Sequence, residues 1–382
     1  MKIHRLLKLL LIGLFFIAGC QNLGADENLE SSNHPLRELP FLQKKGMYQQ
    51  EKEVVPLEVS EATFRSIIGW ISDEEILVNE AFDQGSVLFK YNVYSGEKTE
   101  DIQLEFSIIS TMISPSREFI IIHTAPSPYE ANLKVFRTDT FAEVYNENFE
   151  SSEIVYTWNG NDESKIFVTA FNKDWTYSSY VIRTDLKESQ MVDISQPFAE
   201  WLDENRLLML NWDLESPDIL APFLISSDSG LEIVDGGEYY FFKSWSDLIL
   251  SIGTKGEDFN TAQYTFFNKN LEPIYSFHAP HIAQYSGWMI PHFDYLPELK
   301  DFILVEPYKS GEIGVYTGGY KLVKRNIESG HEEIILEKIE NQPIACSPDG
   351  SLCLFGSILQ DIIYLEEGRV EPFIKYIKNR EQ

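Results

Sequence analysis

Short apolar runs alternate with polar turns at a regular spacing from about residue 57 to the end of the chain. One recurring pattern is a polar turn followed by an apolar strand, as in "WISDEEILV", "WNGNDESKIFV" and "CSPDGSLCLF". The first apolar residues of these strands are Ile76, Phe119, Ile166, Leu207, Ile249, Ile303 and Leu352. Their spacing of roughly 40 to 50 residues is typical of β-propeller blades.

A second, independent pattern repeats in each of these units. It is a later turn between two strands, as in "VYSGEK", "IRTDLKES" and "IESGHEEI", and it falls near Ser95, Asp139, Asp185, Asp228, Lys269, Ser329 and Glu367. Each unit has room for four short strands, and no long amphipathic helix pattern interrupts them. The sequence therefore predicts an all-β protein with one β-propeller over residues 57–378. We expect seven four-stranded blades, with six as the alternative because the spacing into the sixth unit is longer.

Tryptophan recurs at the end of the predicted innermost strand, just before the polar turn, at Trp70, Trp158, Trp201 and Trp245. A single four-stranded blade cannot bury both of its faces, whereas stacking blades in a closed ring buries them. A large flat ring at this position can fill the wedge between neighbouring blades. We therefore interpret these tryptophans as packing residues and not as ligand contacts.

The first twenty residues have the layout of a bacterial lipoprotein signal. Lys2, Arg5 and Lys8 precede an apolar run that ends in "IAGC". This run is too short to span a bilayer, and its layout is that of a secretory signal. Aliphatic, small and small residues before a cysteine match a lipobox. We expect residues 1–19 to be a signal peptide and Cys20 to become a lipidated N-terminus.

Residues 20–56 are polar, without a sustained hydrophobic period, which predicts a flexible linker between the lipid and the propeller. The formal net charge is −29, and cleavage of the signal removes three basic residues and no acid. Such an acidic body repels polyanions. We therefore exclude nucleic acid as a partner and expect contact with the membrane only through the lipid, on the extracytoplasmic face.

The lipobox, the acidic linker and the repeated "W-x-x-[DE]" turns together resemble the YqgU-like family of Gram-positive lipoproteins. The resemblance covers nearly the whole chain. It implies a propeller of six blades, and it supplies no catalytic residues to carry over.

One long segment between blades, "FHAPHIAQYSGWMIPHFDY", concentrates histidine and aromatic residues. We predict that it forms a loop at the mouth of the propeller and contributes His281, Trp288, His292 and Tyr295 to ligand binding. His278, His281, His292 and Asp294 are metal-ligand types. However, His278 and His281 would point to opposite faces of a strand, so we predict no metal site and no cofactor.

Cys346 and Cys353 flank the turn in "CSPDGSLC". The extracytoplasmic compartment permits a disulfide between them, and the alternative is two buried thiols that pack as small apolar residues. The turn geometry leaves both open, and the sequence favours the thiols.

No nucleophile elbow, phosphate loop or Cys-x-x-Cys motif occurs in the chain. We therefore expect a non-enzymatic binding or scaffolding module at the cell surface, with a protein, peptide or glycan as ligand. The alternative is an extracytoplasmic glycan hydrolase or lyase that uses carboxylates in the propeller funnel.

Overall fold

The computed structural model describes residues 52–213, 219–255, 258–285 and 287–377. The predicted signal peptide, Cys20 and most of the predicted linker lie outside this part of the chain. All regular secondary structure in the described residues is β-strand.

Five four-stranded sheets follow the chain order. Blade 1 contains β2 (Phe64–Trp70), β3 (Glu75–Phe82), β4 (Gly85–Asn92) and β5 (Lys98–Leu104). Blade 2 contains β6 (Ile108–Ile113), β7 (Phe119–Ser127), β8 (Glu130–Arg137) and β9 (Glu143–Phe149). Blade 3 contains β10 (Glu153–Trp158), β11 (Lys165–Phe171), β12 (Tyr177–Arg183) and β13 (Glu188–Val192). Blade 6 contains β23 (Phe293–Leu296), β24 (Asp301–Pro307), β26 (Tyr320–Asn326) and β27 (Glu332–Ile339), and blade 7 contains β28 (Ile344–Cys346), β29 (Leu352–Phe355), β30 (Asp361–Tyr364) and β31 (Arg369–Pro372).

Blades 4 and 5 share one long strand and so form a single seven-stranded sheet. Its strands are β14 (Ala199–Trp201), β15 (Leu207–Leu210), β16 (Ala221–Ser227), β17 (Gly230–Ser244), β18 (Ile249–Lys255), β19 (Asp258–Phe267) and β20 (Pro273–Pro280). The first part of β17 pairs with β16 as the outer strand of blade 4, and its last part pairs with β18 as the inner strand of blade 5. Counted in this way, the described strands make seven four-stranded units.

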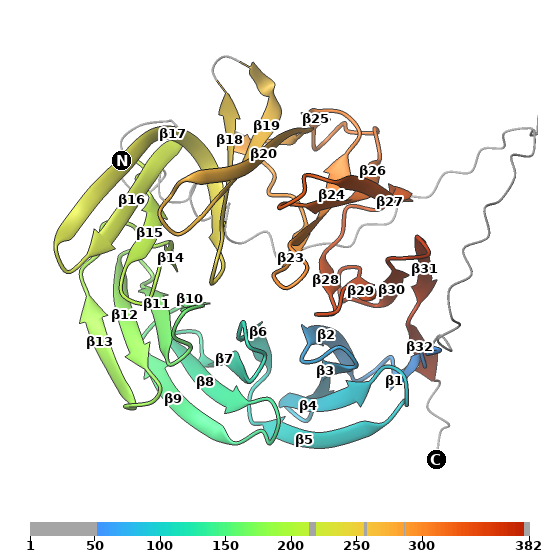
Figure 1. The fold of residues 1–382 in the computed structure, drawn as a ribbon. Helices are drawn as coiled ribbons and strands as arrows, with labels where there is room; N and C mark the ends of the chain where they lie inside the picture. The colour runs from blue at the N-terminus through green and yellow to red at the C-terminus, as the bar shows by residue number, and fades with distance from the viewer. Residues whose placement is uncertain (1–51, 214–218, 256–257, 286, 378–382) are drawn as a thin grey trace, which may run out of the picture. The chain divides into compact units, whose positions relative to one another are not determined.

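Seven separate hydrophobic clusters lie at the seams between successive units, including the seam between blade 7 and blade 1. The blades are arranged around a common axis, with the first strand of each nearest to it (Figure 1). Each blade therefore buries both faces against its neighbours, as a closed ring requires.

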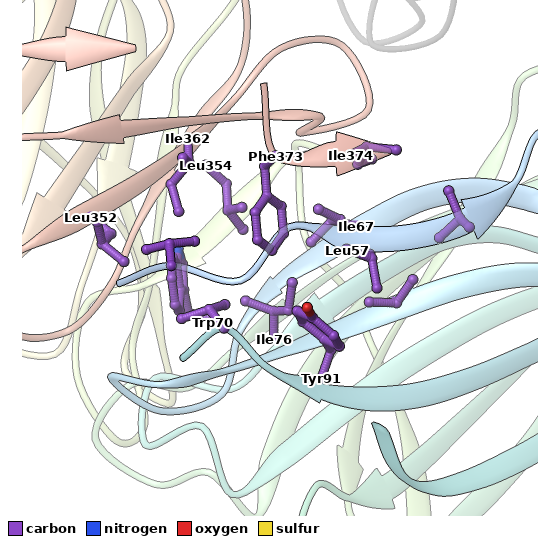
Figure 2. Packing of buried hydrophobic residues seen from close by; sticks show 14 of the residues in the cluster. Leu57, Ile67, Trp70, Ile76, Tyr91, Leu352, Leu354, Ile362, Phe373 and Ile374 are labelled. Atoms are coloured by element: carbon purple, nitrogen blue, oxygen red, sulfur yellow. The ribbon is translucent and has the colours of Figure 1, made fainter. Parts of the chain in front are cut away.

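The ring closes where blade 7 meets blade 1. In Figure 2, Trp70 and Ile76 of blade 1 lie close to Leu352 and Leu354 of blade 7, and Phe373 packs beside them. Outside the blades, β1 (Leu57–Ser60) and β32 (Ile374–Ile377) pair in parallel across this seam. The two ends of the body are thus joined by backbone hydrogen bonds as well as by apolar packing.

The inner-strand tryptophans have the packing role predicted from the sequence. The indole nitrogen of Trp70 donates to the carbonyl of Ala345 at 2.9 Å, in the blade before it. Trp158 donates in the same way to Met112 at 3.2 Å, and Trp201 donates to Thr157 at 3.4 Å. Each of these side chains is at least 95% buried, so each links two blades with both an apolar and a polar contact.

The predicted positions of the second strands are also confirmed. All seven residues identified as strand starts lie among the first three residues of β3, β7, β11, β15, β18, β24 and β29.

The antiparallel pairing gives the ring two different ends. Connections between first and second strands, and between third and fourth strands, lie at one end, and none is longer than six residues. We call this the short-turn end. The other connections lie at the opposite end, which we call the long-loop end, and two of them, residues 281–292 and 308–319, contain twelve residues each.

Candidate binding face

A small sheet covers blades 5 and 6 at the long-loop end. It consists of β21 (Ile282–Gln284), β22 (Gly287–Trp288) and β25 (Gly311–Glu312), in the order β22-β21-β25. The pairing of β21 with β25 is parallel, and it joins the two longest connections between the described strands of the blades. We call residues 281–285, 287–292 and 308–319 the cap.

An aromatic stack supports the cap from below. The ring of Trp288 lies 5.4 Å from that of His281 and 5.0 Å from that of Tyr240 at the start of the inner part of β17. His281 and Tyr240 are more than 90% buried, and burial raises the pKa of the Tyr240 hydroxyl. The structure therefore brings together two of the predicted loop residues, His281 and Trp288, and adds Tyr240, which the sequence analysis missed.

The outer surface of the cap exposes apolar side chains. Tyr285 is 82% exposed and Val315 is 74% exposed, and Ile313 and Tyr308 are about half exposed. Tyr129 and Ile109 on blade 2 are further exposed apolar residues at this end of the ring. Large exposed apolar side chains that gather on one face are characteristic of interaction surfaces.

His292 and Tyr295 lie away from the outer surface of the cap. The loop ends at His292, whose pKa is lowered by burial. Tyr295 is in the inner strand β23, is 4% exposed, and packs against Trp245 with ring centroids 5.0 Å apart. The prediction that Tyr295 belongs to a mouth loop is wrong. The strand β23 begins at Phe293, and the Tyr295 side chain packs into the seam between blades 5 and 6.

Asp294 on the inner strand of blade 6 interacts electrostatically with Arg117, which lies in the turn between β6 and β7 of blade 2. The Asp294 carboxylate on β23 accepts hydrogen bonds from the backbone N–H of Cys346 at 2.7 Å and of Tyr295 at 2.8 Å. Burial nevertheless raises its pKa to about 6, while these hydrogen bonds and the charge of Arg117 act in the opposite direction. The Arg117 guanidinium forms no hydrogen bond or ion pair with any described residue, and burial lowers its pKa. This pair thus combines a carboxyl whose pKa is raised with an arginine whose pKa is lowered.

Other polar groups on or beside the inner strands are occupied by contacts within and between blades. The Ser110 hydroxyl lies 3.2 Å from Nδ1 of His123 and 2.8 Å from the Tyr156 hydroxyl. Burial lowers the pKa of His123 to about 4. Glu200 accepts from Thr157 at 2.8 Å and pairs with Lys243 at 2.7 Å. Because these groups satisfy one another, they stabilise the ring and offer little to a ligand.

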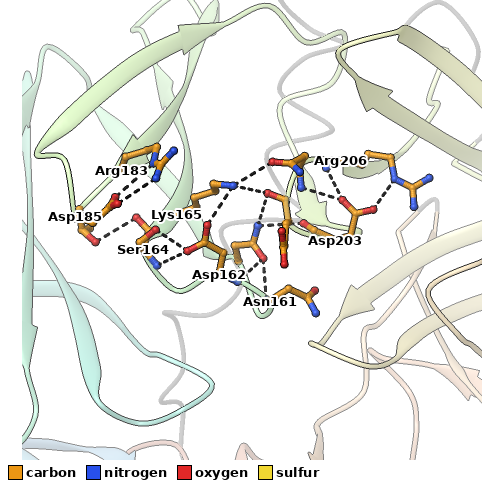
Figure 3. Close-up of polar contacts among 12 residues, drawn as sticks. Asn161, Asp162, Ser164, Lys165, Arg183, Asp185, Asp203 and Arg206 are labelled. Carbon is orange, nitrogen blue, oxygen red and sulfur yellow. Dashed lines mark hydrogen bonds and ion pairs between the residues drawn. The ribbon is translucent and has the colours of Figure 1, made fainter.

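Several charged side chains of the short-turn end are paired locally (Figure 3). Asp162 pairs with Lys165 at 3.2 Å, and Asp203 pairs with Arg206 at 2.6 Å. Asn161 crosses from blade 3 to donate to the carbonyl of Ser246 in blade 5 at 3.0 Å. These contacts fix the turns against one another.

Cys346 and Cys353 occupy opposed positions on β28 and β29 and are joined by a disulfide in the structure. Their Cα atoms are 3.9 Å apart. Cys346 ends the inner strand of blade 7, the position that tryptophan holds in blades 1, 3 and 4. The sequence analysis favoured free thiols, and the oxidation state in the cell stays a prediction.

No group of three or more His, Cys, Asp or Glu side chains in the described residues is placed to hold a metal ion. Within the same part of the chain, no helix is long and apolar enough to cross a membrane.

Residues 92–356 match the family described as YqgU-like 6-bladed beta propeller domain. The chain belongs to this family. It is 24% identical over 333 residues to the uncharacterized lipoprotein YqgU of Bacillus subtilis (strain 168). The aligned region covers 85% of this chain and 88% of the relative. The YqgU-like description counts six blades, whereas the sheets and seams of this chain give seven units. The matched residues begin at the end of β4 and stop just after β29, so they omit much of the first and last blades.

Solved structures show the same fold. An uncharacterized protein of Listeria monocytogenes EGD-e superposes with a TM-score of 0.77 at 22% identity, over 87% of this chain and 100% of that chain. An oligogalacturonate lyase from Vibrio parahaemolyticus superposes with a TM-score of 0.54 at 12% identity, over 81% and 92% of the two chains. At these identities the likeness concerns the fold alone.

Proposed function

We propose that this protein is a surface lipoprotein whose propeller acts as a non-enzymatic binding module, and that the long-loop end is its binding face. The observation that carries the proposal is the cap, where Tyr285, Ile313 and Val315 are exposed on the longest loops. Loops held by a rigid scaffold are common carriers of binding function.

The point at which the chain enters the body supports this choice of face. The N–H of Val55 donates to the carbonyl of Val93 at 2.8 Å, in the turn between β4 and β5. The Tyr91 hydroxyl donates to the carbonyl of Val55, also at 2.8 Å. Val55 therefore lies at the short-turn end, and the long-loop end is the opposite end of the ring.

Attachment to the membrane through Cys20 is part of the proposal. The lipobox and the lipoprotein relative support it. A Cys20→Ser variant should remain unprocessed and should carry no lipid, because only a thiol accepts the diacylglycerol. Metabolic labelling with a fatty acid checks this, and a labelled Cys20→Ser protein would refute the anchor.

Photo-crosslinking in intact cells tests the binding face. A photoreactive amino acid is placed at Tyr285 or Val315 on the cap, and at Leu186 or Met191 as controls. These controls are 53% and 64% exposed, on a short-turn connection and on the outer strand β13. We expect a discrete adduct from the cap positions and none from the controls. Equal adducts from all four positions would contradict the proposal.

A second function rests on Asp294 and Arg117. A carboxyl whose pKa burial raises to about 6, and on which the charge of an arginine acts, is typical of catalytic sites, and it favours the glycan hydrolase or lyase alternative. Purified protein is incubated with wall glycans, and release of new chain ends is measured. Release that is lost in Asp294→Asn and retained in Val315→Ser would establish the enzyme, and no release from wild-type protein would exclude it for those glycans.

A further inference from the structure

The cap is an apolar island in an acidic protein. The chain has 60 acidic and 31 basic residues, but between residues 281 and 292 the sequence has no Asp, Glu, Lys or Arg, and between 308 and 319 it has only Lys309 and Glu312. Tyr285, Ile313 and Val315 are exposed on this surface, together with the few polar side chains Lys309, Glu312 and Thr317. A partner at this surface thus meets apolar side chains first and the acidic body around them.

Three exposed acidic residues are close in sequence to residues that contact the cap. Glu340 precedes Asn341, whose side chain contacts Met289 of the cap at 3.4 Å. Glu238 is two residues before Tyr240, which stacks on Trp288. Asp213 belongs to the same loop as Ile219, whose side chain lies close enough to Gly287 that an added Cβ would approach it to 2.7 Å. All three acidic side chains are exposed.

The cap is held in place by contacts on both sides, so its exposed side chains are presented in a fixed arrangement. The N–H of Ile313 donates to the carbonyl of Ala283 at 3.0 Å, which joins the two loops next to β25. Below them, Trp288 is fixed by the aromatic stack. A preorganised apolar surface loses little conformational freedom when it is covered.

We propose that the cap docks a basic segment of a partner protein, one that places aliphatic side chains on Ile313 and Val315 and directs lysine or arginine toward the acidic residues of the body. This rests on the proposed function and names the chemistry of its partner. Charge complementarity decides the charge of the partner segment. An acidic segment would be repelled by the acidic body as a whole, and an uncharged polar segment would leave the apolar surface uncovered.

The test uses the full mature chain and three synthetic peptides of equal length. One peptide alternates lysine and leucine, the second alternates glutamate and leucine, and the third alternates lysine and serine. Binding is followed by fluorescence anisotropy at low salt and at about 0.15 M salt, where charges beyond about 8 Å are screened. We expect the lysine–leucine peptide to bind at least about tenfold more tightly than the other two, with weaker binding at the higher salt.

Matched variants locate the binding. Ile313→Ser with Val315→Ser should reduce the affinity for the lysine–leucine peptide by at least about tenfold. Met191→Ser with Ile274→Ser, which removes two similarly exposed apolar side chains from the outer strands β13 and β20, should leave it unchanged. Circular dichroism checks that both double variants retain the fold.

The proposal is overturned if the glutamate–leucine peptide binds as tightly as the lysine–leucine peptide, or if the cap variant binds like the wild type. The peptide results can be told apart from a failure of the binding face itself. Adducts at the cap in cells combined with a reversed peptide preference would retain the binding face and refute its basic partner. Absence of adducts at the cap would refute the binding face itself.

Discussion

The two ends of the ring use the same strands but differ in how their side chains are satisfied. At the short-turn end, Asp162 and Asp203 pair within their own turns, and Asn161 donates to blade 5. At the long-loop end, Tyr285 and Val315 project from long connections and are mostly exposed. The first arrangement fixes the blades relative to one another, and the second presents apolar surface to solvent.

This difference separates stability from binding within one fold. Short turns leave few conformations open, so their hydrogen bonds are formed at low entropic cost, whereas long loops tolerate changes in length and sequence. Substitutions at the short-turn end should therefore change the free energy of unfolding, and substitutions on the cap should change binding.

The largest effect is expected from Trp70→Ala. Trp70 is 3% exposed, fills the closing seam and donates to the carbonyl of Ala345. Its loss leaves a cavity and should lower the free energy of unfolding by about 3–5 kcal/mol. Urea unfolding followed by tryptophan fluorescence and circular dichroism measures the change. A loss below about 1 kcal/mol would show that the seam does not determine stability.

Removal of the disulfide should have the next largest effect. Cys346 and Cys353 are seven residues apart, so the closed loop is short and its contribution should be about 2 kcal/mol. The double variant Cys346→Ala, Cys353→Ala should unfold at lower urea than the wild type, and a reductant should shift only the wild type. Alkylation without reduction, followed by mass spectrometry, gives an independent answer. Alkylation of both Cys346 and Cys353 in the denatured, unreduced protein would contradict the bond.

Asp294 should make the stability depend on pH. Its pKa is raised from 3.8 to about 6 in the folded protein, so between about pH 4 and 6 the folded state retains a proton that the unfolded chain releases. Stability contributed by this group is thus lost as the pH rises through that window. Asp294→Asn should not show this loss. As the pH rises from about 4 to 6, the free energy of unfolding of the variant should therefore rise by about 1–2 kcal/mol relative to that of the wild type.

The control for Asp294→Asn is the same substitution at the exposed Asp228. This variant removes one surface carboxylate from the same acidic protein. A parallel course for both variants would show that Asp294 titrates as an ordinary carboxyl.

The smallest effect on stability is expected on the cap. Val315→Ser replaces a side chain that is 74% exposed, so the free energy of unfolding should change by no more than about 0.5 kcal/mol. The same urea titration measures it. A cost as large as that of Trp70→Ala would mean that the cap is part of the core and would remove the contrast between the two ends.

Most of the architecture could be predicted from local patterns. The polar turn followed by an apolar run identifies the second strand of every blade because both the turn and the strand are encoded within about ten residues. The position of Trp70, Trp158 and Trp201 before that turn identified the seam residues in the same way.

Features that depend on distant residues were missed. The parallel pairing of β21 with β25 joins the loop before blade 6 to a loop within blade 6, and Tyr240 reaches the cap from blade 5. The sequence analysis placed Tyr295 in a loop, although the sequence held a signal for a strand. Tyr295 is two residues before "PELKD", a polar turn of the kind that follows the inner strand in other blades. Arg117 and Asp294 come from blades far apart in sequence, so no local pattern could bring them together.

Adduct formation at Val315 compared with Leu186 in intact cells tests the central claim most directly. Both are exposed aliphatic residues, but one lies on the cap and the other on a short turn. If the long-loop end is the binding face, a photoreactive group at Val315 gives a discrete adduct whose yield falls when Ile313→Ser and Tyr285→Ser are added, and the group at Leu186 gives none. An adduct at Leu186 but not at Val315 would contradict the account.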